Sequence, residues 1–98
     1  MSLPVILRSV AEVDVAEIFG NLETIRPGLG RRFIARLREV LDRIEWMPEI
    51  YGVVWQDVRA AKLRKFRYVV YYVVLADHVE VLAVLHGSRA ESEWKQRF

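Results

Sequence analysis

His86 is the side chain best suited to acid–base chemistry in this 98-residue chain, because an unperturbed imidazole titrates near neutral pH. Cleavage of RNA by its own 2′-hydroxyl needs a base, an acid for the leaving oxygen, and cations that stabilise the extra phosphate charge. Arg67 and Arg89 are the candidates for holding that phosphate, and Tyr68 offers a ring on which an unpaired base can stack. A histidine at a strand end is more often a structural hydrogen-bonding group, so catalysis by His86 stays one of two readings.

A basic run lies between Asp57 and Asp77, and no acidic residue interrupts it. Its five cations are Arg59, Lys62, Arg64, Lys65 and Arg67. Because the net charge of the chain is only +2, attraction to an acidic partner has to come from this local cluster. The run predicts a contact with nucleic acid or with the acidic residues of a protein partner; the alternative is an ordinary solvated turn.

Several classes of function are disfavoured by composition. The chain has no cysteine, which excludes disulfides and thiol chemistry and fits a cytoplasmic location. It has no His/Cys ligand cluster and no glycine-rich phosphate loop, so neither a metal nor another cofactor is expected. No apolar stretch is long enough to cross a bilayer, and we expect a protein without a membrane segment.

Two amphipathic helices must position these side chains. Apolar residues recur at helical spacing over residues 10–24 and again over 28–47, with only a short break between them, which predicts a helical hairpin. Ser9 and Glu12 match a capping box for the first helix. Gly20 lies inside that helix and marks either a close packing contact or a weak point.

A β-rich region follows the helices. Residues 58–86 predict a three-stranded antiparallel meander, whereas Val53–Asp57 is expected to be a loop or an irregular strand. A first strand at residues 3–8 would join the meander in parallel after the helical crossover. Tyr71 and Tyr72 are adjacent in a strand, so they should point to opposite faces of the sheet.

The predicted fold class is therefore α+β, in the order β-α-α-β-β-β. The helical hairpin should pack on one face of a four-stranded, mainly antiparallel sheet and leave the other face partly open. The tail, residues 89–98, is expected to form a short last helix or to stay mobile. All 98 residues are expected to form a single domain.

The order of these elements and the residues on them resemble toxins of the RelE/ParE superfamily, which belong to bacterial type II toxin–antitoxin (plasmid stabilization) modules. The segments that carry the resemblance are Met47–Gly52, Arg59 with Leu63, Phe66–Tyr68, Val79–Val84 and His86–Arg89. Arg67 departs from the family pattern, because many members carry a proline at this position.

The resemblance implies a cytoplasmic toxin that is held inactive by a cognate antitoxin. Of the two main activities in the superfamily, we favour the ParE-like one, in which the toxin poisons DNA gyrase by binding it. The alternative is a RelE-like endoribonuclease that cuts mRNA in the ribosome and uses His86, Arg67 and Arg89 for catalysis. In either case Arg59, Lys62, Arg64, Lys65 and Tyr68 are predicted to contact the target. A third reading is a non-toxic member that only binds its antitoxin.

Overall fold

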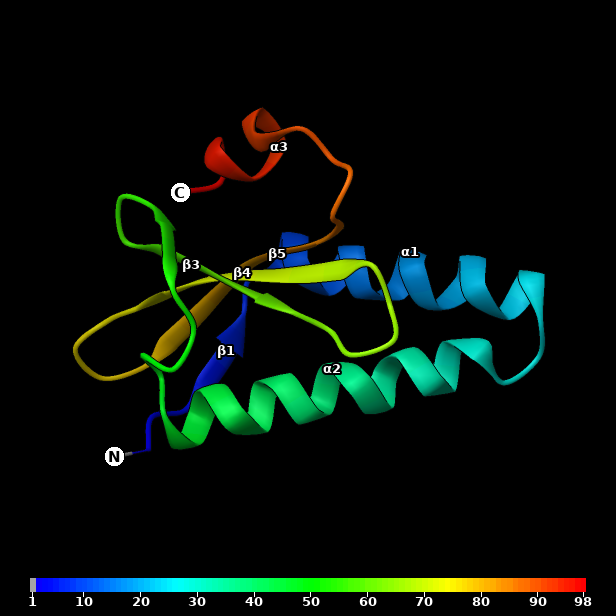
Figure 1. Ribbon diagram of the computed structural model, residues 1–98, viewed down its shortest axis with the longest axis horizontal. Coiled ribbons are helices and arrows are strands. Elements are labelled where there is room, and N and C mark those ends of the chain that lie inside the picture. The colour runs from blue at the N-terminus through cyan, green and yellow to red at the C-terminus, as the bar shows by residue number, and fades with distance from the viewer. Residues whose placement is uncertain (1) are drawn as a thin grey trace.

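Two layers make up the computed structural model, which describes residues 2–98 (Figure 1). Helices α1 (Ser9–Ile25) and α2 (Leu29–Trp46) form an antiparallel hairpin against one face of a five-stranded sheet. The strands are β1 (Val5–Leu7), β2 (Val53–Trp55), β3 (Val58–Lys62), β4 (Tyr68–Val74) and β5 (Val79–His86). A short helix, α3 (Glu91–Lys95), follows the last strand. The α+β class predicted from the sequence is confirmed.

The sheet has the order β1-β5-β4-β3-β2, and only the pairing of β1 with β5 is parallel. The sequence predicted four strands, and the fifth is β2, a three-residue edge strand within the segment Val53–Asp57. Its register with β3 is irregular. A strand this short carries almost no periodicity, which is why the sequence pattern did not identify it.

Each face of the sheet buries its own set of apolar side chains. Tyr72 lies on the helix-covered face with Phe33, while Tyr71 lies on the opposite face with Trp94, as the alternation of a strand requires. Trp94 of α3 stacks on Tyr71 with ring centroids 4.6 Å apart and is almost fully buried. The second face is therefore partly covered by the chain's own tail, and the expectation of an open face holds only for what α3 leaves free.

A β-bulge sets the direction of the side chains at the end of β5. The pairing with β4 shifts between Tyr71 and Tyr72, so that Leu82 is the extra residue on β5. Val79 and Val81 face the helices before the bulge, and Val84 faces them after it. Because side chains alternate along a strand, one extra residue also turns His86 to the helix-covered side.

The backbone N–H groups at the start of the two long helices find other partners than the sequence predicted. The capping box was wrong: Ser9 is already inside α1, and no side chain caps that helix. At α2, the Glu23 carboxylate reaches across from α1 and accepts the backbone N–H groups of Gly28 (3.1 Å) and Gly30 (2.7 Å). These hydrogen bonds, led by the one from Gly28, hold the pKa of Glu23 below its usual value.

Candidate functional site

A cleft of about 350 Å³ lies where the β3–β4 turn meets the end of β5. Its lining consists of Lys62, Leu63, Phe66, Arg67, Tyr68, Val69, His86, Gly87 and Ser88. We call this the His86 cleft. Two cations, an imidazole and two aromatic rings line it, and no carboxylate does.

The two chain segments of the His86 cleft are held together through the backbone. Tyr68 pairs with His86 in the sheet, and the Gly87 N–H then donates to the Arg67 carbonyl at 2.6 Å. A Cβ at position 87 would lie 3.4 Å from that carbonyl oxygen, which is an ordinary van der Waals distance, so the contact leaves room for a small side chain. Arg67 and His86 both line the cleft that these segments enclose.

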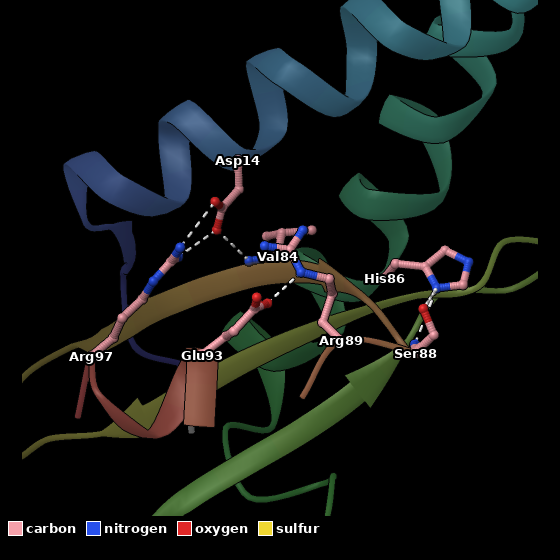
Figure 2. A network of polar contacts seen from close by, with 7 residues as sticks. All are labelled: Asp14, Val84, His86, Ser88, Arg89, Glu93 and Arg97. Carbon is pink, nitrogen blue, oxygen red and sulfur yellow. Dashed lines mark hydrogen bonds and ion pairs between the residues drawn. The ribbon is translucent and has the colours of Figure 1, made fainter. Parts of the chain in front are cut away.

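The His86 ring is oriented by its neighbours. Its Nδ1 accepts the backbone N–H of Ser88 at 3.1 Å and lies 2.8 Å from the Ser88 hydroxyl (Figure 2). Tyr68 contacts the ring edge to face, with centroids 5.6 Å apart. Because a backbone N–H can only donate, Nδ1 must be the acceptor, and the proton of the neutral ring is then on Nε2. In this tautomer Nε2 can donate a hydrogen bond but has no free lone pair for a general base.

Arg89 does not enter the His86 cleft. It forms an ion pair with Glu93 of α3, and this hydrogen bond raises the pKa of Arg89 (Figure 2). It lines a neighbouring hollow of about 170 Å³ beside Asp14 and Glu17 of α1, with His86 between the two spaces. Of the three residues predicted for catalysis, the structure brings His86 and Arg67 together and places Arg89 among carboxylates.

The predicted basic cluster is also divided. Lys62 and Tyr68 line the His86 cleft, whereas Lys65 lines a separate hollow against α2. Arg64 pairs with Glu39 of α2 at 3.3 Å. The expectation that all five cations form one unneutralised patch was therefore wrong, because the chain turns between them and α2 supplies a carboxylate.

Arg59 supports a loop rather than the cleft. Its guanidinium donates to the backbone carbonyl of Tyr51 at 2.7 Å and lies 3.5 Å from the Glu49 carboxylate. Tyr72 donates its hydroxyl to the Pro48 carbonyl at 2.8 Å, and burial raises the pKa of Tyr72 to about 12. Together they fix the segment after α2 against the sheet.

Sequence reasoning missed the most enclosed ion pair. Asp14 of α1 accepts two hydrogen bonds from Arg97 and one from the backbone N–H of Val84 (Figure 2). A signal was present, since Asp14 lies three residues after Ala11 and four before Ile18, on the apolar side of the predicted helix.

Among residues 2–98 no group of potential metal ligands occurs, and no helix is both long and apolar enough to cross a membrane.

Comparison with known proteins identifies the family and the fold in which this site lies. Residues 5–91 match the family described as the ParE toxin of the type II toxin–antitoxin system parDE. A solved structure, the chromosomal ParDE toxin–antitoxin system from P. aeruginosa, superposes with a TM-score of 0.76 at 12% identity. The match covers 87% of this chain and 96% of that one, and at this identity it shows a shared fold. A search of curated protein sequences finds no match.

Proposed function

This chain belongs to the ParE toxins of type II toxin–antitoxin systems, and from that premise we propose that it arrests growth by binding DNA gyrase through the His86 cleft. One observation carries the choice of mechanism: the cleft presents cations and aromatic rings, and its one imidazole has no carboxylate beside it. His86 uses Nδ1 to accept from Ser88, and no carboxylate lines the space. Such a surface suits the recognition of a protein better than the transfer of protons.

Lys62 and Arg67 supply the charge for this contact. Both side chains are exposed, and neither forms an ion pair with any residue from 2 to 98. Tyr68 and Phe66 give the cleft an aromatic wall, and aromatic residues next to arginine are characteristic of the centres of protein interfaces. The gyrase surface that complements this cleft should be acidic.

A supercoiling assay with purified proteins tests this proposal. The toxin should block supercoiling of relaxed plasmid by gyrase or trap the cleavage complex, and Arg67→Glu should weaken that effect about tenfold or more. Arg38→Glu makes the same charge change on an exposed part of α2 and should leave the effect unchanged. Toxin that never affects supercoiling or cleavage-complex formation would remove the gyrase assignment.

The RelE-like alternative has one observation in its favour, since His86, Arg67, Lys62 and Tyr68 do meet in a single cleft. Induced expression followed by mapping of mRNA ends separates it from gyrase inhibition. New ends within translated codons would support the nuclease. Growth that continues normally on induction, with no effect in either assay, would instead identify a non-toxic member that only binds an antitoxin.

The cognate antitoxin, we propose, covers the apolar ridge that follows α2. Five apolar side chains from Trp46 to Val54 are each at least 45% exposed: Trp46, Met47, Ile50, Val53 and Val54. The ridge includes the edge strand β2, whose outer backbone groups have no neighbouring strand. An exposed apolar segment beside a free sheet edge is a typical site for an added strand or an amphipathic helix.

This ridge can be tested with matched variants. Trp46→Ser together with Val54→Ser should weaken antitoxin binding and improve the solubility of toxin expressed alone. Ile25→Ser is the control, because Ile25 is 73% exposed but lies at the far end of α1. If Ile25→Ser weakened binding as much as the double variant, the antitoxin would have to lie elsewhere.

A further inference from the structure

A second hollow, separate from the His86 cleft, lies between α2 and the β3–β4 turn, which runs beside that helix in Figure 1. Its volume is about 540 Å³. The residues that line it are Arg26, Leu29, Arg32, Ala35, Arg36, Lys65 and Phe66. We call it the basic hollow. Phe66 forms the wall between the two spaces, since it also lines the His86 cleft.

The charge of the basic hollow is strongly one-sided. Four of its seven lining residues are cations, and none is acidic. Arg36 pairs with Glu39 at 2.5 Å, but Arg26, Arg32 and Lys65 form no ion pair with any residue of the described chain, 2–98. Three cations that share a concave surface without a counter-charge repel one another, and an anionic ligand relieves that repulsion.

The backbone at Lys65 gives an independent reason to expect a ligand here. Its φ is +68°, in the left-handed region that favours glycine or asparagine. A lysine therefore makes this turn less stable than glycine would. Strain of this kind is concentrated at binding and switch sites, where the side chain is needed for another purpose.

The uncharged part of the hollow decides which anion fits. Leu29, Ala35 and Phe66 give it apolar walls, and Phe66 is held by edge-to-face packing on Phe33 with centroids 6.1 Å apart. A nucleic-acid backbone needs cations along a continuous track, whereas here Glu39 pairs with Arg36, one of the lining cations, and with Arg64 outside the lining. Cations around a compact apolar patch suit a peptide that combines carboxylates with one bulky apolar side chain.

We propose that the basic hollow binds an acidic segment of a partner protein. Its carboxylates pair with Arg26, Arg32 and Lys65, and an apolar side chain between them packs on Leu29 and Phe66. This contact is distinct from the gyrase contact at the His86 cleft and from the ridge Trp46–Val54. Binding at the basic hollow can therefore be tested separately from growth arrest.

An NMR titration of the isotopically labelled full chain with a short acidic peptide tests the proposal. The probe is a fluorescein-labelled pentapeptide with leucine between two pairs of glutamates, and the same peptide with glutamines is its control. Amide shifts should concentrate at Leu29, Arg32 and Lys65, and Arg32→Ala should weaken binding about fivefold. Arg38→Ala removes a cation from the same helix outside the hollow and should leave binding unchanged.

Lys65→Gly separates binding from folding. This change should weaken peptide binding while it raises the Tm by about 4 °C, because glycine adopts the left-handed conformation without strain. If Lys65→Gly raised the Tm but left the affinity for the peptide unchanged, the Lys65 side chain would take no part in binding, and the proposal would be overturned. Equal binding of the glutamine peptide, shifts centred on His86, or tighter binding of an eight-thymidine oligonucleotide in the hollow would overturn it as well.

Discussion

Asp14 and Arg97 are 83 residues apart in sequence, yet two hydrogen bonds of 2.6 and 3.2 Å join their side chains. The same carboxylate accepts the Val84 N–H at 3.0 Å, at the part of β5 that β1 does not reach. The Asp14 side chain is only 11% exposed. One acidic residue thus connects the first helix, strand β5 and the C-terminal tail.

Loss of Arg97 should destabilise the fold. Arg97→Ala leaves a poorly exposed carboxylate without its cation, and we expect the free energy of unfolding to fall by about 1–3 kcal/mol. Urea denaturation followed by circular dichroism measures the change. Arg38→Ala, at an exposed position, should alter stability by less than about 0.5 kcal/mol. Similar effects of the two variants would show that the Asp14–Arg97 pair contributes nothing specific.

Substitution of two glycines in the helical hairpin by alanine should change the stability of the fold in opposite directions. A Cβ at Gly30 would lie 2.8 Å from the Phe19 ring and 2.9 Å from the Glu23 side chain, so Gly30→Ala should cost about 1–3 kcal/mol. Gly20 has no atom within 4 Å of such a Cβ, and Gly20→Ala should stabilise α1 by about 0.5–1 kcal/mol. Thermal unfolding of both variants checks the prediction, and a stabilising Gly30→Ala would contradict the close contact.

Stability should depend on pH through His78. Its Nδ1 lies 2.7 Å from the Asp77 carboxylate and its Nε2 lies 3.0 Å from that of Glu80, and these hydrogen bonds raise the pKa of His78 above 6.5. A raised folded-state pKa gives stability that is complete below the unfolded value and is lost as the pH rises through the folded value. The wild type should therefore lose this contribution as the pH is raised above about 6.5.

The two histidines provide the control for this pH effect. His78→Gln should flatten the dependence of the denaturation midpoint between about pH 6 and about pH 9. His86→Gln should keep that dependence, because His78 and its two carboxylates remain in place. A pH profile that His78→Gln leaves unaltered would contradict the assignment.

His86→Ala should leave growth arrest within about tenfold of the wild type, because the ring packs and donates hydrogen bonds in the proposed gyrase contact. Removal of a true general acid or base costs about 10²–10⁴-fold in rate. Titrated induction in liquid culture, with protein levels matched by immunoblotting, measures the difference. A loss of two or more orders of magnitude, accompanied by fewer mRNA ends, would favour the nuclease.

The elements with strong periodicity were predictable, and those set by single residues were not. Seventeen residues of α1 and eighteen of α2 repeat their apolar face often enough to be recognised. The bulge at Leu82 adds one residue to an apolar run, and no pattern in that run marks it. The face on which His86 lies therefore required the three-dimensional structure.

The candidate site shows the same limit. Arg59 and Lys62 are three residues apart in the sequence, but on a strand this spacing is about 10 Å and reverses the side-chain direction. Arg59 consequently supports the loop at Tyr51, whereas Lys62 faces the His86 cleft. Neighbours in the sequence predicted one patch, and the strand geometry separates these two members of it.

The strand order has a consequence for synthesis of the chain. β5 is the last strand to be made, yet it lies between β1 and β4. Val5 can pair with Val79 only after the chain has been translated as far as that residue, so the apolar face of the helical hairpin lacks the strand at its centre until then. A nascent toxin is thus incomplete while it is being made. We expect a partner that is present during synthesis to meet the chain before its central strand is in place.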